Sequence, residues 1–504
     1  MPQLRSDFIP APAFYGMARQ RQYAPLGPEW CTLAKNIVVD GQNRLAARNG
    51  WTLQNTAITG SPNIVQMHEY LNAAGASELI TATATKLFSG ITTLTEKTGS
   101  LVFTTGNWKF VNFNGFCLGW VTGETPIQYT GSGNFTTIVV SDGGTLPDGN
   151  TVLAAFGRVW GLDDDKQTIR YSALLDHTAW ATSSGGGLID MRSVWTKGMD
   201  EVMAIVSYGS YLVVFGKRHI VLWTDGAGSD IGLDPNNMYV TQVIENVGLV
   251  ARDALALVGE QDVVFWSSNG VRSLARTTQE QPTSANELTP SNNDFLALAL
   301  LDGDLTKVRM AHFPLQSLAL LAHPDNATTY VFDLRQRLED GGYRLTVWDV
   351  VPTSMTSTID ESLYMGFNGR IGKYEGFADN AVKYTYEYQS GWVPMVQQDN
   401  RRRILKHMRP MIYSPADRTV AFKWWTDFLY NTRGTSAALD AGGSEWGEDE
   451  WALMEWGAGQ QFHFSEVPLA GECEYLKLAV RTNINGAGFG IGPMRVYTSQ
   501  ARMA

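Results

Sequence analysis

Short apolar runs separated by glycine, asparagine and aspartate dominate the chain from about residue 36 to residue 376. The runs either alternate with polar residues or are apolar throughout, as at 212–215. This texture predicts strands and tight turns, since strand side chains alternate between two faces and turns favour small or polar residues. Helical signals are few, with 293–301 the best candidate and 197–205 a weaker one.

The strand runs recur at a loose spacing of about 40 to 55 residues, with three or four strands in each unit. Seven apolar reference positions are separated by 37, 43, 53, 51, 55 and 45 residues. Radial repetition of small sheets leaves few exposed strand edges. The pattern therefore predicts an all-β protein with a β-propeller of about six or seven short-stranded blades, and a set of unrelated β-sandwiches is the alternative. The reference positions are Leu79, Phe116, Val159, Leu212, Val263, Leu318 and Leu363.

Two units contain residues that are typical of β-hairpin turns. In 208–223 a buried-type strand turns at Gly216-Lys217, and in 263–274 the pair Asn269-Gly270 favours the positive φ angles of a two-residue hairpin. Because all four residues of 212–215 are apolar and none alternates with a polar residue, we expect this strand to be buried on both faces.

The two ends of the chain differ from the middle. The first 34 residues are rich in proline, arginine and aromatic residues, which predicts an extended arm that packs on its own body or on a neighbour. After residue 376, strict alternation at 384–388 and a strong strand at 419–425 indicate another β unit. We therefore expect an arm at 1–34, a propeller at 35–381 and an additional C-terminal β domain at 382–504.

Composition and charge exclude several classes of protein. The 504 residues are 44% apolar and only 18% charged, so the chain can bury a large core and general disorder is excluded. The net charge of −11 argues against a protein whose main task is to grip nucleic acid, which needs a positive field. No run approaches ~18 apolar residues, so we expect no membrane span, and residues 1–12 lack the apolar core of a secretory signal.

Motifs for catalysis, metals and cofactors are missing from the sequence. The three cysteines, Cys31, Cys117 and Cys473, are odd in number and far apart, which fits buried thiols in a reducing compartment. Asp163, Asp164 and Asp165 form the one acidic triplet. It suits a cation site or part of a glycosidase carboxylate pair, but a solvated hairpin tip is the simpler interpretation. We expect no catalytic residue, no metal and no cofactor.

Two segments of the C-terminal region are candidates for contacts between subunits. A basic run is either a solvated face, an ion-pairing edge at a subunit interface or a phosphate contact. Its residues are Arg401, Arg402, Arg403, Lys406 and Arg409, of which the first four are the candidate contacts. Trp446, Trp451 and Trp456 lie in a stretch rich in glycine and glutamate. They suit core packing, stacking on sugars, or insertion into a groove of a neighbour.

Several segments together resemble the nozzle, or tail hub, proteins of short-tailed bacteriophages, also described as packaged-DNA stabilisation proteins or tail tubular protein B. In 36–51, Asn36 is followed by Arg48-x-Gly50 before an aromatic residue, and 211–220 is the most specific match. The order and spacing of the segments carry the resemblance, which spans roughly 35–375. The segments are 36–51, 157–180, 211–220, 248–251 and 265–271.

The resemblance implies a structural virion protein that is not an enzyme. It implies a homo-hexameric ring in the phage tail, made in the host cytoplasm and placed below the portal adaptor. Other expected partners are tail proteins such as fibres or a needle, and DNA passing through the channel without sequence-specific binding. Six copies carry −66, a field that repels phosphate and suits a channel in which DNA slides. The alternative function is a propeller carbohydrate-binding protein or glycoside hydrolase.

Overall fold

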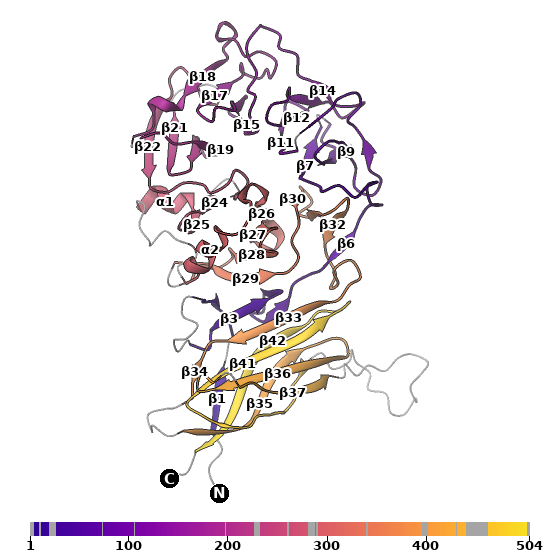
Figure 1. Ribbon diagram of the computed structural model, residues 1–504, viewed down its shortest axis with the longest axis vertical. Coiled ribbons are helices and arrows are strands. Elements are labelled where there is room, and N and C mark those ends of the chain that lie inside the picture. Colours follow the sequence, from indigo (N-terminus) through magenta and orange to yellow (C-terminus); the bar gives the residue numbers. More distant parts are fainter. Residues whose placement is uncertain are drawn as a thin grey trace.

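The computed structural model is almost entirely β in the part of the chain that it describes (Figure 1). Within that part, the two α-helices are α1 (Leu274–Glu280) and α2 (Asn293–Ala299), and no helix is long and apolar enough to cross a membrane. The described residues are 5–9, 12–19, 27–72, 74–104, 106–196, 198–225, 232–259, 262–280, 288, 291–338, 341–395, 402–429, 431–439 and 462–500.

Six small sheets of three or four antiparallel strands form the blades of a β-propeller, in the upper part of Figure 1. Five of them are built from consecutive strands. The strands are β7 (Gln66–Leu71), β8 (Ser77–Ala82), β9 (Leu87–Ser89) and β10 (Thr95–Glu96); β11 (Lys109–Phe113), β12 (Phe116–Trp120), β13 (Ile127–Tyr129) and β14 (Thr136–Thr137); β15 (Val152–Ala155), β16 (Arg158–Leu162), β17 (Thr168–Tyr171) and β18 (Gly187–Asp190); β19 (Val202–Tyr208), β20 (Tyr211–Gly216), β21 (His219–Thr224) and β22 (Tyr239–Glu245); β23 (Leu255–Val258), β24 (Asp262–Ser267) and β25 (Gly270–Ser273).

The sixth small sheet joins distant parts of the sequence. Its strands β30 (Ser354–Ser357), β31 (Leu363–Gly366) and β32 (Ile371–Tyr374) pair in order, and β6 (Trp51–Leu53) adds to β32 from the N-terminal side. Four further strands complete the circle, because β26 packs against both β23 and β30. These strands are β26 (Arg309–Phe313), β27 (Leu318–His323), β28 (Thr328–Asp333) and β29 (Arg344–Trp348). The predicted propeller with an additional β domain is confirmed.

The blade strands are buried where the pattern predicts. Leu212, Val213, Val214 and Phe215 in β20 are all 0% exposed, because β20 lies between β19 and β21 and the neighbouring sheets cover both of its faces. The β24–β25 hairpin turns at Ser268-Asn269, between the paired residues Ser267 and Gly270, so the prediction of Asn269-Gly270 as the turn pair is wrong by one position. Gly270 is the first residue of β25 and has a φ of 105°, a conformation that glycine adopts without a steric penalty.

The additional β domain is a sandwich of two sheets built from both ends of the chain. One sheet has the order β38-β35-β42-β5-β4, and the other runs β3-β33-β41-β36-β37 and continues through β29 into the propeller. Figure 1 places β1 and β42, the first and last strands that the structure describes, in this domain, below the propeller. The strands are β1 (Arg5–Ile9), β2 (Gly16–Met17), β3 (Trp30–Lys35), β4 (Ile37–Val39), β5 (Leu45–Ala47), β33 (Tyr384–Ser390), β34 (Val393–Pro394), β35 (Arg403–Tyr413), β36 (Arg418–Thr426), β37 (Arg433–Leu439), β38 (Phe462–His463), β39 (Val467–Pro468), β40 (Glu472–Cys473), β41 (Tyr475–Ile484) and β42 (Gly490–Gln500).

The sandwich core follows from strict alternation. Tyr384, Tyr386 and Tyr388 of β33 are buried and pack in one cluster with Met408 of β35 and Val496 of β42. Successive residues of a strand point to opposite faces, so each of these strands presents one apolar face to the other sheet.

The N-terminal segment forms strands of the sandwich in the part that the structure describes. β1 pairs antiparallel with β42, and β3 pairs with β33. Phe14 lies under the guanidinium of Arg344 at 4.1 Å, whereas Phe8 is 53% exposed. The boundary predicted at 34/35 therefore falls inside β3, and the propeller begins at β6.

One predicted helix is wrong. The weak helical signal at 197–205 overlaps β19, whose residues from Val202 onward pair with β20. Ala204, Ile205 and Val206 are all buried, and burial on both faces suits a sandwiched strand better than a surface helix. The other predicted helix, 293–301, is confirmed by α2.

A candidate functional site at the junction of propeller and sandwich

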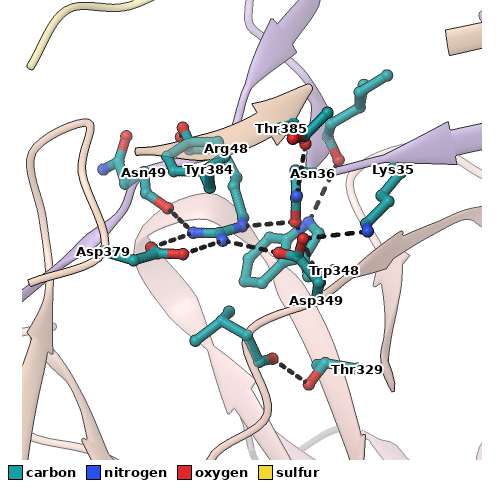
Figure 2. Close-up of polar contacts among 12 residues, drawn as sticks. Lys35, Asn36, Arg48, Asn49, Thr329, Trp348, Asp349, Asp379, Tyr384 and Thr385 are labelled. Carbon is teal, nitrogen blue, oxygen red and sulfur yellow. Dashed lines mark hydrogen bonds and ion pairs between the residues drawn. The ribbon is translucent and has the colours of Figure 1, made fainter. Parts of the chain in front are cut away.

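The chain crosses between the sandwich and the propeller twice, and both crossings lie beside the seam between β29 and β3 (Figure 2). It leaves β5, passes Arg48 and Gly50, and becomes β6 in the propeller. It returns past Asp379 into β33, and Asp349 follows β29 at the seam where β29 pairs with β3. We call the cluster of Lys35, Asn36, Arg48, Asp349 and Asp379 the junction.

Arg48 is the centre of the junction, and its side chain is completely buried. Its two terminal nitrogens donate to the two carboxylate oxygens of Asp379 at 2.8 and 2.7 Å. Its Nε donates to Asn36 Oδ1 at 2.9 Å, and further bonds go to Asp349 Oδ1 and to the carbonyl of Asn49. All five N–H donors of the guanidinium are therefore used within the protein.

Electrostatics keep this arginine charged. Burial alone would lower the pKa of Arg48, but the hydrogen bonds and charge of Asp379 outweigh it and raise the pKa above its ordinary value. The guanidinium also lies 4.1 Å from the ring centroid of Tyr384. Burial tends to raise the pKa of Asp349, but Lys35, whose Nζ is 3.1 Å from its carboxylate, and Arg48 hold it below its usual range.

Asn36 connects the two crossings with the seam of β29 and β3. Its Oδ1 accepts from Arg48 Nε and from the backbone N–H of Asp349, while its Nδ2 donates to the carbonyl of Thr385 at 2.7 Å. Its φ of 57° lies in the left-handed region, which asparagine tolerates better than most residues. An amide, with one acceptor and one donor end, is the side chain that can make this set of bonds.

Gly50 and Trp51 complete the segment. A Cβ on Gly50 would lie 2.0 Å from the carbonyl oxygen of Ala378, so only glycine lets the outgoing and returning strands approach so closely. Trp51 stacks on Phe367 with ring centroids 4.4 Å apart. The pattern Asn36 … Arg48-x-Gly50-Trp51, which carries part of the family resemblance, is thus the set of residues that fixes the propeller on the sandwich.

The junction has the chemistry of a structural joint. Its two cations and two carboxylates balance, and Arg48 has no donor left for a substrate. Among the residues that the structure describes, no group of three or more histidine, cysteine, aspartate or glutamate side chains could hold a metal ion.

The acidic triplet lies at the hairpin between β16 and β17. Asp163 pairs with Arg170 at 2.8 Å. Asp165 accepts from the backbone N–H groups of Gln167 and Thr168 and pairs with Arg192. Asp163 and Asp165 are therefore held by local bonds at a surface hairpin.

The predicted contact residues are separated by the structure. Arg402 is exposed and pairs with Asp427 and Glu474 of its own chain, and Lys406 is exposed in β35. Arg403 is 1% exposed and its Nε donates to the carbonyl of Met395, so its prediction as a contact residue is wrong: alternation in β35 turns it into the sandwich. Four further predicted residues lie outside the described part of the chain: Arg401, Trp446, Trp451 and Trp456.

Two hollows lie on the propeller, and the first includes Trp51 beside the junction. The first, of about 440 Å³, is lined by the stacked pair Trp51 and Phe367 together with Ser61, Val351, Thr353, Asn368 and Arg370. The second, of about 560 Å³, is rich in threonine and has the exposed ion pair of Lys86 and Glu96 in its lining.

Among known proteins, only solved structures resemble this chain, and they do so at low sequence identity. No family model and no curated protein matches the chain. The extracellular domain of a putative one-component system from Bacteroides thetaiotaomicron has a TM-score of 0.43 at 10% identity over 84% of this chain, which spans 61% of that structure. An auxiliary nutrient binding protein from the same species has a TM-score of 0.33 at 9% identity, over 66% of this chain and 76% of its own.

Proposed function

We propose that the protein is a non-catalytic subunit of the tail nozzle of a short-tailed bacteriophage, which forms a ring below the portal adaptor. The observation that carries the proposal is the junction, because the residues that resemble the family in 36–51 hold the propeller on the sandwich. A ring component under load from packaged DNA needs its parts fixed to one another, and a saturated, buried arginine pair supplies that stiffness.

The charge of the chain supports the same proposal. Each copy carries −11, so a ring of copies presents an acidic field that keeps DNA from adhering to its walls. Two features of the sandwich surface suit contacts in such a ring: the half-exposed ring of Phe8 on β1 and the exposed Lys406 on β35. Arg402 is less available, because two carboxylates of its own chain hold it.

Co-assembly with a portal–adaptor complex tests the proposal. The purified chain is mixed with the portal and adaptor proteins encoded with it, and the product is examined by negative-stain microscopy. We expect a ring at the distal end of the adaptor. Lys406→Glu should weaken attachment, whereas Arg192→Glu, an exposed control in the propeller, should not. A chain that stays monomeric and unattached under these conditions contradicts the proposal.

A second candidate function is carbohydrate binding, which the 440 Å³ hollow favours. Trp51 and Phe367 are both partly exposed there, and Asn368, Arg370 and Thr353 surround them with hydrogen-bonding groups. Aromatic faces with adjacent polar groups are the surface on which a sugar ring stacks. Titration with a panel of oligosaccharides tests it. Saturable binding that Arg370→Ala abolishes would support it, and the absence of binding would contradict it.

A further inference from the structure

A second buried charge cluster lies where several blades meet at one end of the propeller axis. Lys109 begins β11 and Arg309 begins β26, while Arg252 and Asp253 immediately precede the blade of β23. The first strands of successive blades pack side by side around the axis, as β7 with β11, β11 with β15 and β23 with β26. Their starts therefore converge, and we call Lys109, Arg252, Asp253 and Arg309 the axial cluster.

Arg252 bridges the blades within this cluster. One terminal nitrogen donates to the carbonyls of Asn107 and Asn150 at 3.1 and 2.8 Å, and the other donates to the carbonyl of Trp108 at 2.9 Å. Its remaining donors go to Asp253 Oδ2. These acceptors precede β11, β15 and β23, so a single side chain ties together the starts of three blades.

Asp253 is the acidic member of the cluster, and three cations surround it. Its Oδ2 pairs with Arg252 and lies 3.5 Å from Arg309, while its Oδ1 lies 3.3 Å from Lys109 Nζ. Burial would raise the pKa of Asp253, but the charges of Arg252, Lys109 and Arg309 hold it far below its ordinary value. One carboxylate against three cations leaves the cluster with a net charge of +2.

Two polar atoms beside the cluster have no partner. Arg309 Nε and Asn107 Oδ1 are both buried and make no hydrogen bond within the protein. Burial lowers the pKa of Arg309, partly opposed by Asp253. The other carboxylate that raises the pKa of Arg309 is Asp304, which is exposed and accepts from Thr306. One of these atoms is a donor and the other an acceptor, and a buried polar atom without a partner is costly.

The cluster is open to solvent on one side. The side chain of Lys109 is 32% exposed, whereas those of Arg252, Asp253 and Arg309 are exposed by 9 to 11%. A small solute can therefore reach the side chain of Lys109 without unfolding the blades, whereas the Nε of Arg309 is buried. Excess positive charge at a site of low dielectric constant attracts anions more strongly than the same charge in water.

We propose that the axial cluster binds a small, doubly charged oxyanion of the phosphate type, held by Lys109 Nζ at the exposed side and attracted by the excess charge of Arg252 and Arg309 beside Asp253. Phosphate oxygens accept strong hydrogen bonds from an ammonium group, and the net charge of +2 favours a doubly charged anion over a singly charged one. This site is independent of the proposed ring, since it lies within a single propeller.

Calorimetric titration of the intact protein with inorganic phosphate tests the site, with sulfate and acetate compared at matched ionic strength. We expect saturable binding of phosphate and sulfate and at least tenfold weaker binding of acetate. Lys109→Met should weaken phosphate binding at least tenfold, and Lys86→Met, which removes an exposed lysine elsewhere in the propeller, should leave it unchanged. Thermal unfolding without phosphate checks that both variants are folded.

Two outcomes would overturn the proposal. One is the absence of saturable phosphate binding to the wild-type protein, a result that does not depend on any variant. The other is equal phosphate affinity in Lys109→Met and the wild type. Should Lys109→Met fail to fold, Lys109→Arg retains the charge and should keep phosphate binding within a few-fold of the wild type, and loss of binding in that folded variant would also contradict the site.

Discussion

Arg48 at the junction and Arg252 at the propeller axis each donate all five guanidinium N–H groups within the protein. They differ in their surroundings. The junction sets two carboxylates, Asp349 and Asp379, against two cations, whereas the axial cluster sets Asp253 alone against three.

The junction is balanced in charge and the axial cluster is not, and this difference gives Arg48 and Arg252 different roles. A balanced, saturated cluster has nothing left to bind and serves to hold two parts of the chain together. A cluster with excess charge attracts a solute of the opposite charge. Burial alone does not distinguish the two, because both arginines are almost fully buried.

Removing the junction arginine should have the largest effect. Arg48→Met removes the buried cation from two partly exposed carboxylates, Asp379 and Asp349, and should cost about 3 kcal/mol, the lower end of the range for losing one partner of a buried pair. Chemical denaturation measures the free energy of unfolding. The control Arg192→Ala removes an exposed pair and should change it by less than about 1 kcal/mol. Equal losses in the two variants would show that the junction is not the stiff joint described above.

Removing Asp253, the one carboxylate of the axial cluster, should cause the second largest loss of stability. Unlike a loss at the junction, it should respond to added phosphate. Asp253→Asn leaves three cations uncompensated and should destabilise the fold by up to about 3 kcal/mol. Phosphate should restore part of that loss, because a bound anion replaces the missing charge. Asp379→Asn at the junction should gain nothing from phosphate. The same response to phosphate in both variants would remove the distinction between the clusters.

The pH dependence of stability offers a third comparison, through His68 on β7. Burial lowers the pKa of His68 to about 4, although a hydrogen bond with Asn112 opposes the shift, and Lys109 of the axial cluster lowers it further. The unfolded state binds a proton at His68 more readily than the folded state does. The stabilisation that comes from keeping His68 neutral is therefore fully present above pH 6.5 and is lost as the pH falls toward 4; the loss is ~3 kcal/mol at most.

Denaturation at several pH values in wild type and His68→Gln isolates this contribution. The variant should lose less stability than wild type between pH 6.5 and 4. NMR titration of His68 should also show a higher pKa in Lys109→Met, because one nearby positive charge is removed. An unchanged pKa would mean that the field of the axial cluster does not reach β7.

The smallest expected effect concerns the close approach of strands at the junction. Gly50→Ala places a methyl group against the carbonyl of Ala378, and overpacking of this kind costs about 1–3 kcal/mol. Gly41→Ala is the matched control, since a Cβ there meets nothing within 4 Å and should change stability by less than about 0.5 kcal/mol. Thermal unfolding of the two variants is the measurement, and equal melting temperatures would contradict the tight contact.

Local patterns predicted the elements that local interactions determine. The apolar run at 212–215, the β24–β25 hairpin and the helix at 293–299 all follow from residues close in sequence. Long-range pairing could not be predicted in this way. β3 lies between β29 and β33, two strands that come more than 300 residues after it in the chain. For this reason the sequence predicted an N-terminal arm rather than strands of a sandwich.

The two arginine clusters were missed for the same reason. Arg48 meets Asp349 and Asp379 across separations of 301 and 331 residues, and Arg252 meets Asn107 across 145. A single arginine in a loop has no local signature of burial. The usable signals were Gly50 after Arg48 and the adjacent pair Arg252-Asp253, and neither identifies its partners.

The mass of the native assembly tests the proposed ring most directly. Native mass spectrometry of the complex formed with portal and adaptor should show six copies of the 55.5 kDa chain added to each adaptor ring, about 333 kDa. Another stoichiometry, or no complex, together with saturable binding of an oligosaccharide by the free monomer, would contradict the ring and favour the carbohydrate-binding function.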